Sequence, residues 1–191
     1  MPDIEKIKIY LENNLSKKRY THSLGVAEEA VRLAKHYGAN VEKAYLAGIV
    51  HDVAKEIPAD KALDLLKNKY GAEIDKVTEN TFKLMHGVLG TYMIQSEFEI
   101  CDADILDAVR YHTTAKADMS LLTKIIYMAD YIEPNRDFDG VDDLRKLAYE
   151  NLDNAIMVGI EFTLTELIEK GSMLHLDTVD AYNYLLLNKG V

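Results

Sequence analysis

The near absence of helix breakers is the feature that most constrains what this chain can fold into. Only three prolines occur, Pro2, Pro58 and Pro134. In the long stretches between them apolar residues recur at helical spacing, as in the series Ile4, Ile7, Leu11 and Leu15. No stretch shows sustained apolar–polar alternation or β-branched runs joined by hairpin turns. The pattern predicts an all-α fold.

Residues that favour helix ends place the boundaries. Asp3, Ser16 and Asn40 each precede an apolar periodic segment and can accept hydrogen bonds from its first free N–H groups. Gly38 is a typical helix end, and Pro58 suits a helix start. We expect helices over residues 4–15, 16–38, 40 to about 55, 58 to about 71, 84–98, 102–112, 120–132, 141–151, 153–170 and 178–188, with loops over 133–140 and 171–177.

Composition limits the classes of function. Hydrophobic residues make up 48% and charged residues 28% of the 191 positions, which is ordinary for a single globular domain spanning residues 1–191. The formal net charge of -10 argues against a nucleic-acid partner, because phosphate backbones require clustered Lys and Arg. A small anionic substrate is still compatible with this charge if a bound metal supplies local positive charge.

The single cysteine, Cys101, excludes an intramolecular disulfide. The N-terminal residues do not read as a signal peptide, and no apolar run approaches the roughly 20 residues that a membrane-spanning helix requires. These features predict a cytoplasmic protein without a membrane partner. The apolar content is also compatible with a homodimer.

Several polar residues lie within or at the end of apolar helical faces. His22 precedes Val26 by one helical turn, and Asp130 follows Ile126 by the same interval. An unpaired buried carboxylate costs several kcal/mol, so two such Asp residues beside several His residues predict a divalent cation. Imidazole and carboxylate ligands suit iron, manganese or zinc. The residues of this kind are His22, His51, Asp52, His112 and Asp130, and His86 has similar neighbours.

Each of these residues has a plainer interpretation when it is taken alone. A single His on an apolar face is more often a core residue bonded to a carbonyl, and Asp130 could pair with an Arg. The combination points to a metal site. A purely structural helical protein would leave the inward Asp and His residues unexplained.

The order of these residues along the chain resembles a known family. It runs Arg19-Tyr20-Thr21-His22, His51-Asp52-Val53-Ala54-Lys55, His86-Gly87, Tyr111-His112-Thr113-Thr114 and Ala129-Asp130 through Arg136. This is similar to the HD superfamily, whose pattern is His, then His-Asp, then a distant Asp. More closely, it resembles the YqeK-type symmetrical bis(5'-nucleosyl)-tetraphosphatases, and the likeness extends to Met173–Thr178 and Ala181–Leu186.

The resemblance implies a role for each matching residue. One divalent metal, implied to be iron with manganese or cobalt as alternatives, would be held by His22, His51, Asp52 and Asp130. His86 and His112 would hold a second metal or bind phosphate, and with Asp52 and Lys55 they form the expected catalytic set. The expected phosphate contacts are Arg19, Lys55, Thr113 and Arg136, and the expected nucleoside contacts are Met173, Leu174, His175, Leu176, Asp177 and Thr178. The resemblance also implies an HD-domain bundle whose core, about 16–135, is joined by C-terminal helices within 141–190 that complete the nucleotide pocket.

Two positions depart from the pattern of the group. Ala115 stands where glycine is expected after His112-Thr113-Thr114, and Tyr182 stands where arginine is frequent before Asn183. Neither position belongs to the implied metal ligands. Tyr182 could alter substrate preference.

The resemblance implies a reaction, which we take as the hypothesis. Water would attack an inner phosphorus of diadenosine tetraphosphate and release two ADP molecules. Two alternatives stay open on the residues alone: another HD phosphohydrolase, such as a nucleotidase or phosphodiesterase, and a catalytically silent sensor that binds metal and nucleotide.

Overall fold

The computed structural model describes residues 2–188, and within that range all regular structure is helical. The predicted all-α fold is therefore confirmed. The elements are α1 (Ile4–Asn14), α2 (Lys17–Tyr37), α3 (Val41–Val50), α4 (Ala59–Asp64), the π-helix η1 (Leu65–Lys69), α5 (Lys76–Asn80), α6 (Phe82–Phe98), α7 (Ala103–Tyr111), α8 (Leu121–Ile132), α9 (Val141–Glu150), α10 (Leu152–Glu169) and α11 (Leu176–Leu187).

The predicted caps define the first three helices. The Asp3 carboxylate accepts hydrogen bonds from the second and third backbone N–H groups of α1, and the Ser16 hydroxyl accepts one from Arg19 N at the start of α2. Asn40 caps α3 in the same way. Gly38 ends α2 with a φ of 73°, the left-handed conformation that glycine adopts readily.

The third helix ends earlier than predicted, at Val50 rather than near Lys55. The His51 ring explains the early end, because its Nδ1 lies 2.7 Å from Gly48 O, the carbonyl that would accept Asp52 N in a continuing α-helix. Turns of the i→i+3 kind follow, with Lys55 N bonded to Asp52 O at 2.9 Å.

The structure differs from the predicted helices at three further places. The segment expected as one helix from Pro58 divides into α4 and the π-turn η1, in which Tyr70 N bonds to Leu65 O. Helix α5, capped by Asp75, had not been expected at all. Helix α11 begins at Leu176, within the predicted loop 171–177, because His175 acts as its cap, a role for which histidine is not a favoured residue.

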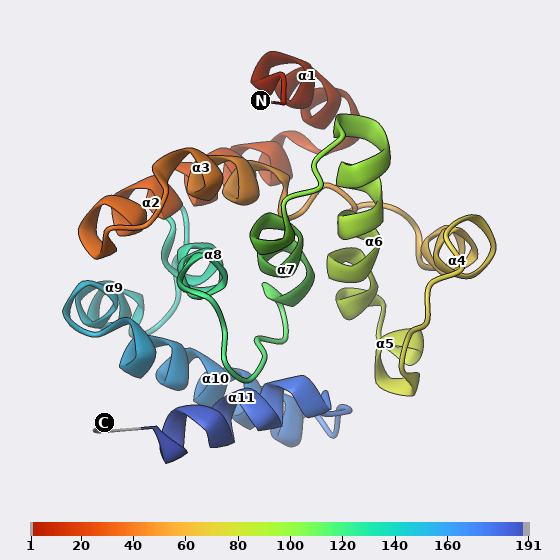
Figure 1. Ribbon diagram of the computed structural model, residues 1–191. Coiled ribbons are helices and arrows are strands. Elements are labelled where there is room, and N and C mark those ends of the chain that lie inside the picture. Colours follow the sequence, from red (N-terminus) through yellow and green to blue (C-terminus); the bar gives the residue numbers. More distant parts are fainter. Residues whose placement is uncertain (1, 189–191) are drawn as a thin grey trace.

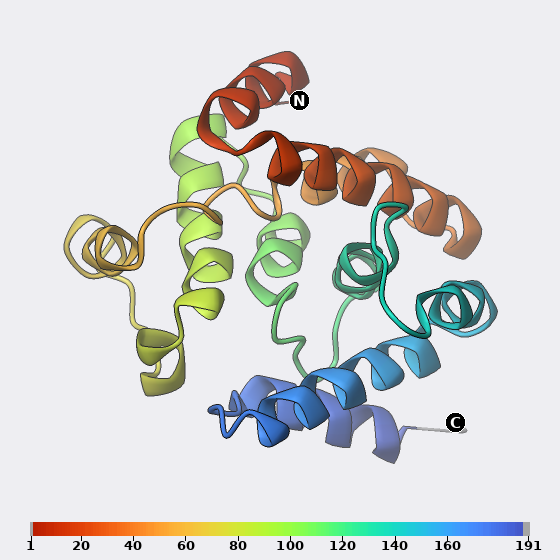
Figure 2. The ribbon, with the colours of Figure 1, turned by 180° about the vertical axis from the view of Figure 1, so that it is seen from behind.

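Helix α8 lies at the centre of the fold, in contact with α2, α3, α7, α9 and α10. In Figures 1 and 2, α2 and α3 run side by side along one edge, and α10 and α11 lie across the opposite edge. Helix α6 packs against α7 at close range, since a Cβ atom at Gly87 would lie 2.7 Å from Arg110 O. This close approach brings His86 beside His112.

Helices α9, α10 and α11 extend the core toward the C-terminus, α9 and α10 contacting α8 and α11 contacting α10. Residues 189 and 190 of the predicted C-terminal helices lie outside the described residues. Among residues 2–188, no helix has the length and apolar character that crossing a lipid bilayer requires.

Candidate metal centre

Six polar residues from five helical segments meet at one place. His22 lies on α2, His86 on α6 and Asp130 on α8, whereas His51 and Asp52 directly follow α3 and His112 directly follows α7. Five are buried, and the Asp130 side chain is 18% exposed. The fold thus brings together His22, His51, Asp52, His86, His112 and Asp130, the six residues that the apolar helical faces and the sequence order had singled out.

Asp52 lies at the middle of the cluster, and each of its carboxylate oxygens faces two imidazoles. Oδ2 lies 3.4 Å from His51 Nε2 and 3.8 Å from His22 Nε2. Oδ1 lies 3.0 Å from His86 Nε2 and 3.5 Å from His112 Nε2. The carboxylate therefore connects two halves of the cluster.

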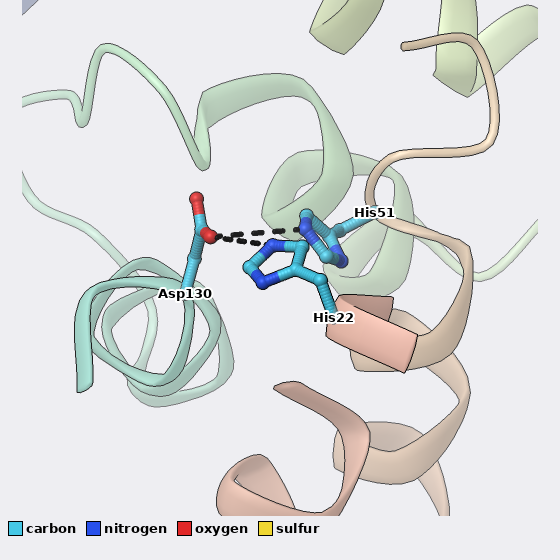
Figure 3. Close-up of side chains that lie close together, drawn as sticks. All are labelled: His22, His51 and Asp130. Carbon is cyan, nitrogen blue, oxygen red and sulfur yellow. Dashed lines mark ion pairs between the residues drawn. The ribbon is translucent and has the colours of Figure 1, made fainter. Parts of the chain in front are cut away.

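Asp130 closes the half that contains His22 and His51 (Figure 3). Its Oδ1 lies 3.0 Å from His22 Nε2 and 3.9 Å from His51 Nε2. Ligand atoms of these three residues all lie within 4.8 Å of one another, as do those of a second, overlapping group formed by His51, Asp52 and His112. Both groups have a spacing that can hold a metal ion.

Hydrogen bonds on the outer side of the rings fix their tautomers. His51 Nδ1 and His112 Nδ1 each lie 2.7 Å from a backbone carbonyl, of Gly48 and Val109 respectively. A carbonyl only accepts, so each Nδ1 carries a proton, and in the neutral ring the Nε2 lone pair faces the cluster. This is the arrangement that metal-binding histidines adopt.

Several inward atoms lack a hydrogen-bond partner within the described part of the chain. They include His22 Nε2, His51 Nε2 and Asp52 Oδ1, which are all buried. Leaving one such atom unpaired costs about 1–3 kcal/mol, whereas a cation would satisfy all three together. The donor set of imidazole nitrogen and carboxylate oxygen suits a divalent transition metal, and no thiolate is present in it. The residues therefore fit a divalent metal.

The charges in the cluster also favour a cation. Burial alone would raise the pKa of Asp52, but the neighbouring His51, His112 and His86 lower it well below its ordinary value. The pKa of Asp130 is likewise lowered, against the effect of burial, by His22 and His51 and by Arg136. Both carboxylates are therefore negative at neutral pH.

His86 differs from the other imidazoles. Burial lowers its pKa to about 4, although Asp52 acts in the opposite direction. The ring is thus neutral at physiological pH, and its Nε2 lies 2.9 Å from His112 Nε2. A neutral imidazole can bind a metal or accept a proton.

Three cationic side chains surround the cluster, each partly exposed. Arg19 Nη1 lies 2.7 Å from Asp52 Oδ2, and Lys55 Nζ lies 3.5 Å from Asp52 Oδ1 and 3.1 Å from His86 Nε2. Arg136 pairs with the Asp130 carboxylate and donates from Nε to Asp130 O. These residues had been expected to contact phosphate, and the structure places their positive charges beside the predicted metal ligands.

Thr113 and residues 173–178 are the remaining expected contact residues. Thr113 is half-buried in the turn after α7. The expected nucleoside contacts are Met173, Leu174, His175, Leu176, Asp177 and Thr178. Of these, His175 contacts Asp75 Oδ2 at 3.0 Å and Thr78 Oγ1 at 3.2 Å through its Nε2. Within the described residues, no hydrogen bond or ion pair joins this segment to the cluster; its polar contacts go to the start of α5.

The two departures from the family pattern have structural correlates. Ala115 is completely buried and has a φ of 58°, a left-handed conformation in which glycine is easier to accommodate. Tyr182 donates from its hydroxyl to Glu161 Oε1 at 3.1 Å, which links α11 to α10. Neither residue contacts the six clustered side chains.

Glu133 is a site residue that the sequence reasoning missed. It is 1% exposed, and its Oε1 lies 3.0 Å from His22 Nδ1. The only available signal was its place between Asp130 and Arg136 in the quoted motif, since it follows the end of α8 and belongs to no apolar helical face.

An all-helical fold that gathers His, His-Asp and a distant Asp at one buried centre defines a class of metal-dependent protein. Residues 19–135 match the family described as the HD domain. The chain belongs to the HD domain family.

Relatives along almost the whole chain specify the group within that family. The chain is 40% identical over 177 residues to the symmetrical bis(5'-nucleosyl)-tetraphosphatase of Bacillus subtilis strain 168, covering 92% of this chain and 94% of the relative. It is 42% identical over 176 residues to the protein of the same name from Halalkalibacterium halodurans, covering 92% and 93%.

A solved structure has the same fold. The crystal structure of a predicted HD superfamily hydrolase involved in NAD metabolism from Clostridium acetobutylicum superposes with a TM-score of 0.95 and 46% sequence identity. The superposition covers 98% of each chain. The arrangement of helices α1–α11 is thus shared with an experimentally determined protein.

Proposed function

We propose that this chain hydrolyses diadenosine tetraphosphate symmetrically to two ADP molecules, using a divalent metal held by the His/Asp cluster. The observation that carries the proposal is the cluster itself, with buried Nε2 and carboxylate oxygen atoms that lack partners. Two relatives of at least 40% identity over nearly the full length bear the name of this activity.

The reaction can be written with the residues at hand. Water oxygen bonds to one of the two central phosphorus atoms, and the bond from that phosphorus to the central bridging oxygen breaks, so that each product is ADP. A divalent metal at His22, His51, Asp52 and Asp130 would supply water activation and charge neutralisation. Neutral His86 is proposed to act in proton transfer, and Lys55 Nζ, 3.1 Å from its Nε2, can stabilise charge on the phosphate.

Arg19, Arg136 and Thr113 complete the proposed phosphate-binding set. The two guanidiniums pair with Asp52 and Asp130, so each can turn from a carboxylate to a phosphate oxygen without leaving the cluster. His112 is proposed to act with His86, whether on phosphate or on a second metal. Their Nε2 atoms both lie within 3.5 Å of Asp52 Oδ1.

The nucleoside part of the substrate is proposed to bind beside residues 173–178, with the C-terminal helices completing the pocket around the core of residues 16–135. Met173 and Leu176 are 49% and 73% exposed and offer apolar surface to a base. Met173→Ala should raise KM for the dinucleotide and leave metal content unchanged.

We also propose a metal, an oligomeric state and a cellular location for the protein. Iron is the proposed metal, in one or two ions, with manganese or cobalt as substitutes. Metal analysis of anaerobically purified protein tests this proposal. A homodimer and a cytoplasmic location are also proposed, and sedimentation and fractionation test them.

The decisive experiment supplies diadenosine tetraphosphate with Fe²⁺, Mn²⁺ or Co²⁺ under anaerobic conditions and separates the products. ADP as the only nucleotide product is expected. ATP and AMP in equal amounts would instead indicate asymmetric cleavage, and no product with any metal would contradict the proposal. Asp52→Ala serves as the inactive control.

A substrate panel separates the competing functions. Mononucleotides, cyclic nucleotides and NAD should be cleaved much more slowly than the tetraphosphate; NAD belongs in the panel because of the name of the structurally similar Clostridium protein. Faster cleavage of any of them would favour another HD phosphohydrolase. Tight ADP binding without turnover of any substrate would favour a sensor.

A further inference from the structure

Glu133 is a buried carboxylate directed at the outer nitrogen of His22, away from the clustered ligands. Its Oε1 lies 3.0 Å from His22 Nδ1. Its Oε2 accepts two hydrogen bonds from Asn135, from the backbone N at 2.7 Å and from Nδ2 at 2.9 Å. One carboxylate oxygen thus serves the imidazole, and the other is held by the loop that follows α8.

The neighbouring helix leaves a space shaped for this carboxylate. A Cβ atom at Gly25 would lie 2.5 Å from Glu133 Oε2, far inside van der Waals contact. Gly25 is one turn after His22 on α2, so the same helix supplies both the imidazole and the room for the group that orients it. A side chain at this position would displace the carboxylate.

Arg145 on α9 holds the loop from the other side. Its Nε donates to Ile132 O at 3.0 Å, and its Nη2 donates to Glu133 O at 3.1 Å and to Arg136 O at 2.9 Å. A single guanidinium therefore fixes three carbonyls around Glu133. This bracing limits the movement of the backbone that carries the carboxylate.

We propose that Glu133 is a positioning residue that keeps the Nδ1 proton of His22 and thereby directs its Nε2 lone pair at the metal. A carboxylate bonded to the outer nitrogen of an imidazole ligand fixes the ring orientation and increases its basicity. The inference rests on the metal-dependent function proposed above. Gly25, Asn135 and Arg145 support the role by fixing Glu133.

The first test measures metal alone, without nucleotide, so that it is independent of the substrate. Titration with Co²⁺ should give a dissociation constant about 10–100-fold weaker for Glu133→Ala, with Glu133→Gln intermediate because the amide oxygen still accepts the Nδ1 proton. Glu29→Ala is the matched control, since Glu29 is also a buried carboxylate on an element of this core but bonds to Tyr149 and Arg32. It should bind Co²⁺ like the wild type.

The second test measures the tautomer of the His22 imidazole. In ¹⁵N-histidine NMR spectra of the metal-free protein, assigned with a His22→Gln variant, His22 should be the Nδ1–H tautomer in the wild type and lose that preference in Glu133→Ala. Gly25→Ala keeps the Glu133 carboxylate but displaces it, so this variant should also bind Co²⁺ more weakly than the wild type. If Glu133→Ala does not fold, Gly25→Ala takes its place in the test.

Three results would overturn the inference. They are Co²⁺ affinity within twofold of wild type in folded Glu133→Ala or Gly25→Ala, an equal loss in Glu29→Ala, and an unchanged His22 spectrum. Failure to cleave diadenosine tetraphosphate with normal Co²⁺ binding would reject the proposed substrate and leave this inference standing.

Discussion

At the scale of single residues, the central fact is that Asp52 presents one oxygen to His51 and His22 and the other to His86 and His112. Asp52→Asn keeps the shape but removes the charge and one acceptor. Metal content should be lost, and ADP formation should fall by more than the roughly 100-fold seen for outer-shell changes. Elemental analysis and product chromatography measure both, and retained metal would remove Asp52 from the ligand set.

Lys55 allows the phosphate role to be separated from the metal role. Lys55→Met removes a positive charge beside His86 but no metal ligand, so kcat should fall about 100-fold, as when one charge-stabilising donor is lost, while metal content stays at the wild-type level. Lys67→Met, in which the lost ammonium pairs with Glu79, should change neither quantity. Loss of metal in Lys55→Met would contradict the separation.

The six clustered residues could be predicted from sequence because five of them lie on or end apolar helical faces, where a polar side chain stands out. Glu133 could not be predicted in this way, since it follows the end of α8 and its contact with His22 joins residues distant in sequence. The contacts of Arg19 and Lys55 with Asp52 depend on packing between elements, which periodicity does not describe.

At the scale of elements, predictions succeeded where a side chain caps the first turn, as at Ser16 and Asn40. The predictions were wrong where tertiary contacts or a single cap determine the extent of a helix. His51 ends α3 by binding Gly48 O, and Asp75 supports a helix of only five residues, too short to show a hydrophobic period.

Asp75 predicts a measurable link between two elements. Its carboxylate caps α5 and contacts His175 at the start of α11, so Asp75→Ala should cost about 1 kcal/mol of unfolding free energy and lower Tm by roughly 2–4 °C. Thermal unfolding measures this at pH 7, and Asp139→Ala, in an exposed loop, is the control.

The same substitution has a predicted pH dependence. Burial acts to raise the pKa of Asp75, but hydrogen bonds from Thr78 and His175 lower it below its ordinary value. A lowered folded-state pKa stabilises the protein above the unfolded value of about 3.9, and this contribution is lost as pH falls. The Tm difference between wild type and Asp75→Ala should therefore shrink below that pH; a constant difference down to pH 3 would contradict the assigned interaction.

At the scale of the whole molecule, the candidate ligands are far apart in the sequence, from His22 to Asp130. They lie on or directly after α2, α3, α6, α7 and α8. The complete set exists only in the folded chain. The all-helical architecture could be predicted because it depends on local periodicity, but the packing of α2 and α3 on α8 could be expected only through the family resemblance.

Metal should consequently stabilise the whole fold. At a free Co²⁺ concentration of 100 times Kd the gain is about 2.7 kcal/mol, which corresponds to a rise in Tm of roughly 5–10 °C. Thermal scans with and without Co²⁺ test this, using Asp52→Asn as a variant in which the rise should disappear. An equal rise in that variant would show that the ion acts elsewhere.

The order of the ligands along the chain has a consequence for protein synthesis. His22, His51 and Asp52 leave the ribosome well before Asp130 and Glu133, so a growing chain can offer a metal only part of its ligands. Because the packing of α8 against α2 and α3 brings the last carboxylates to the first imidazoles, the group of His22, His51 and Asp130 is completed late in maturation. Chains that stop before α8 would thus lack Asp130 and Glu133 and could not complete the group of His22, His51 and Asp130.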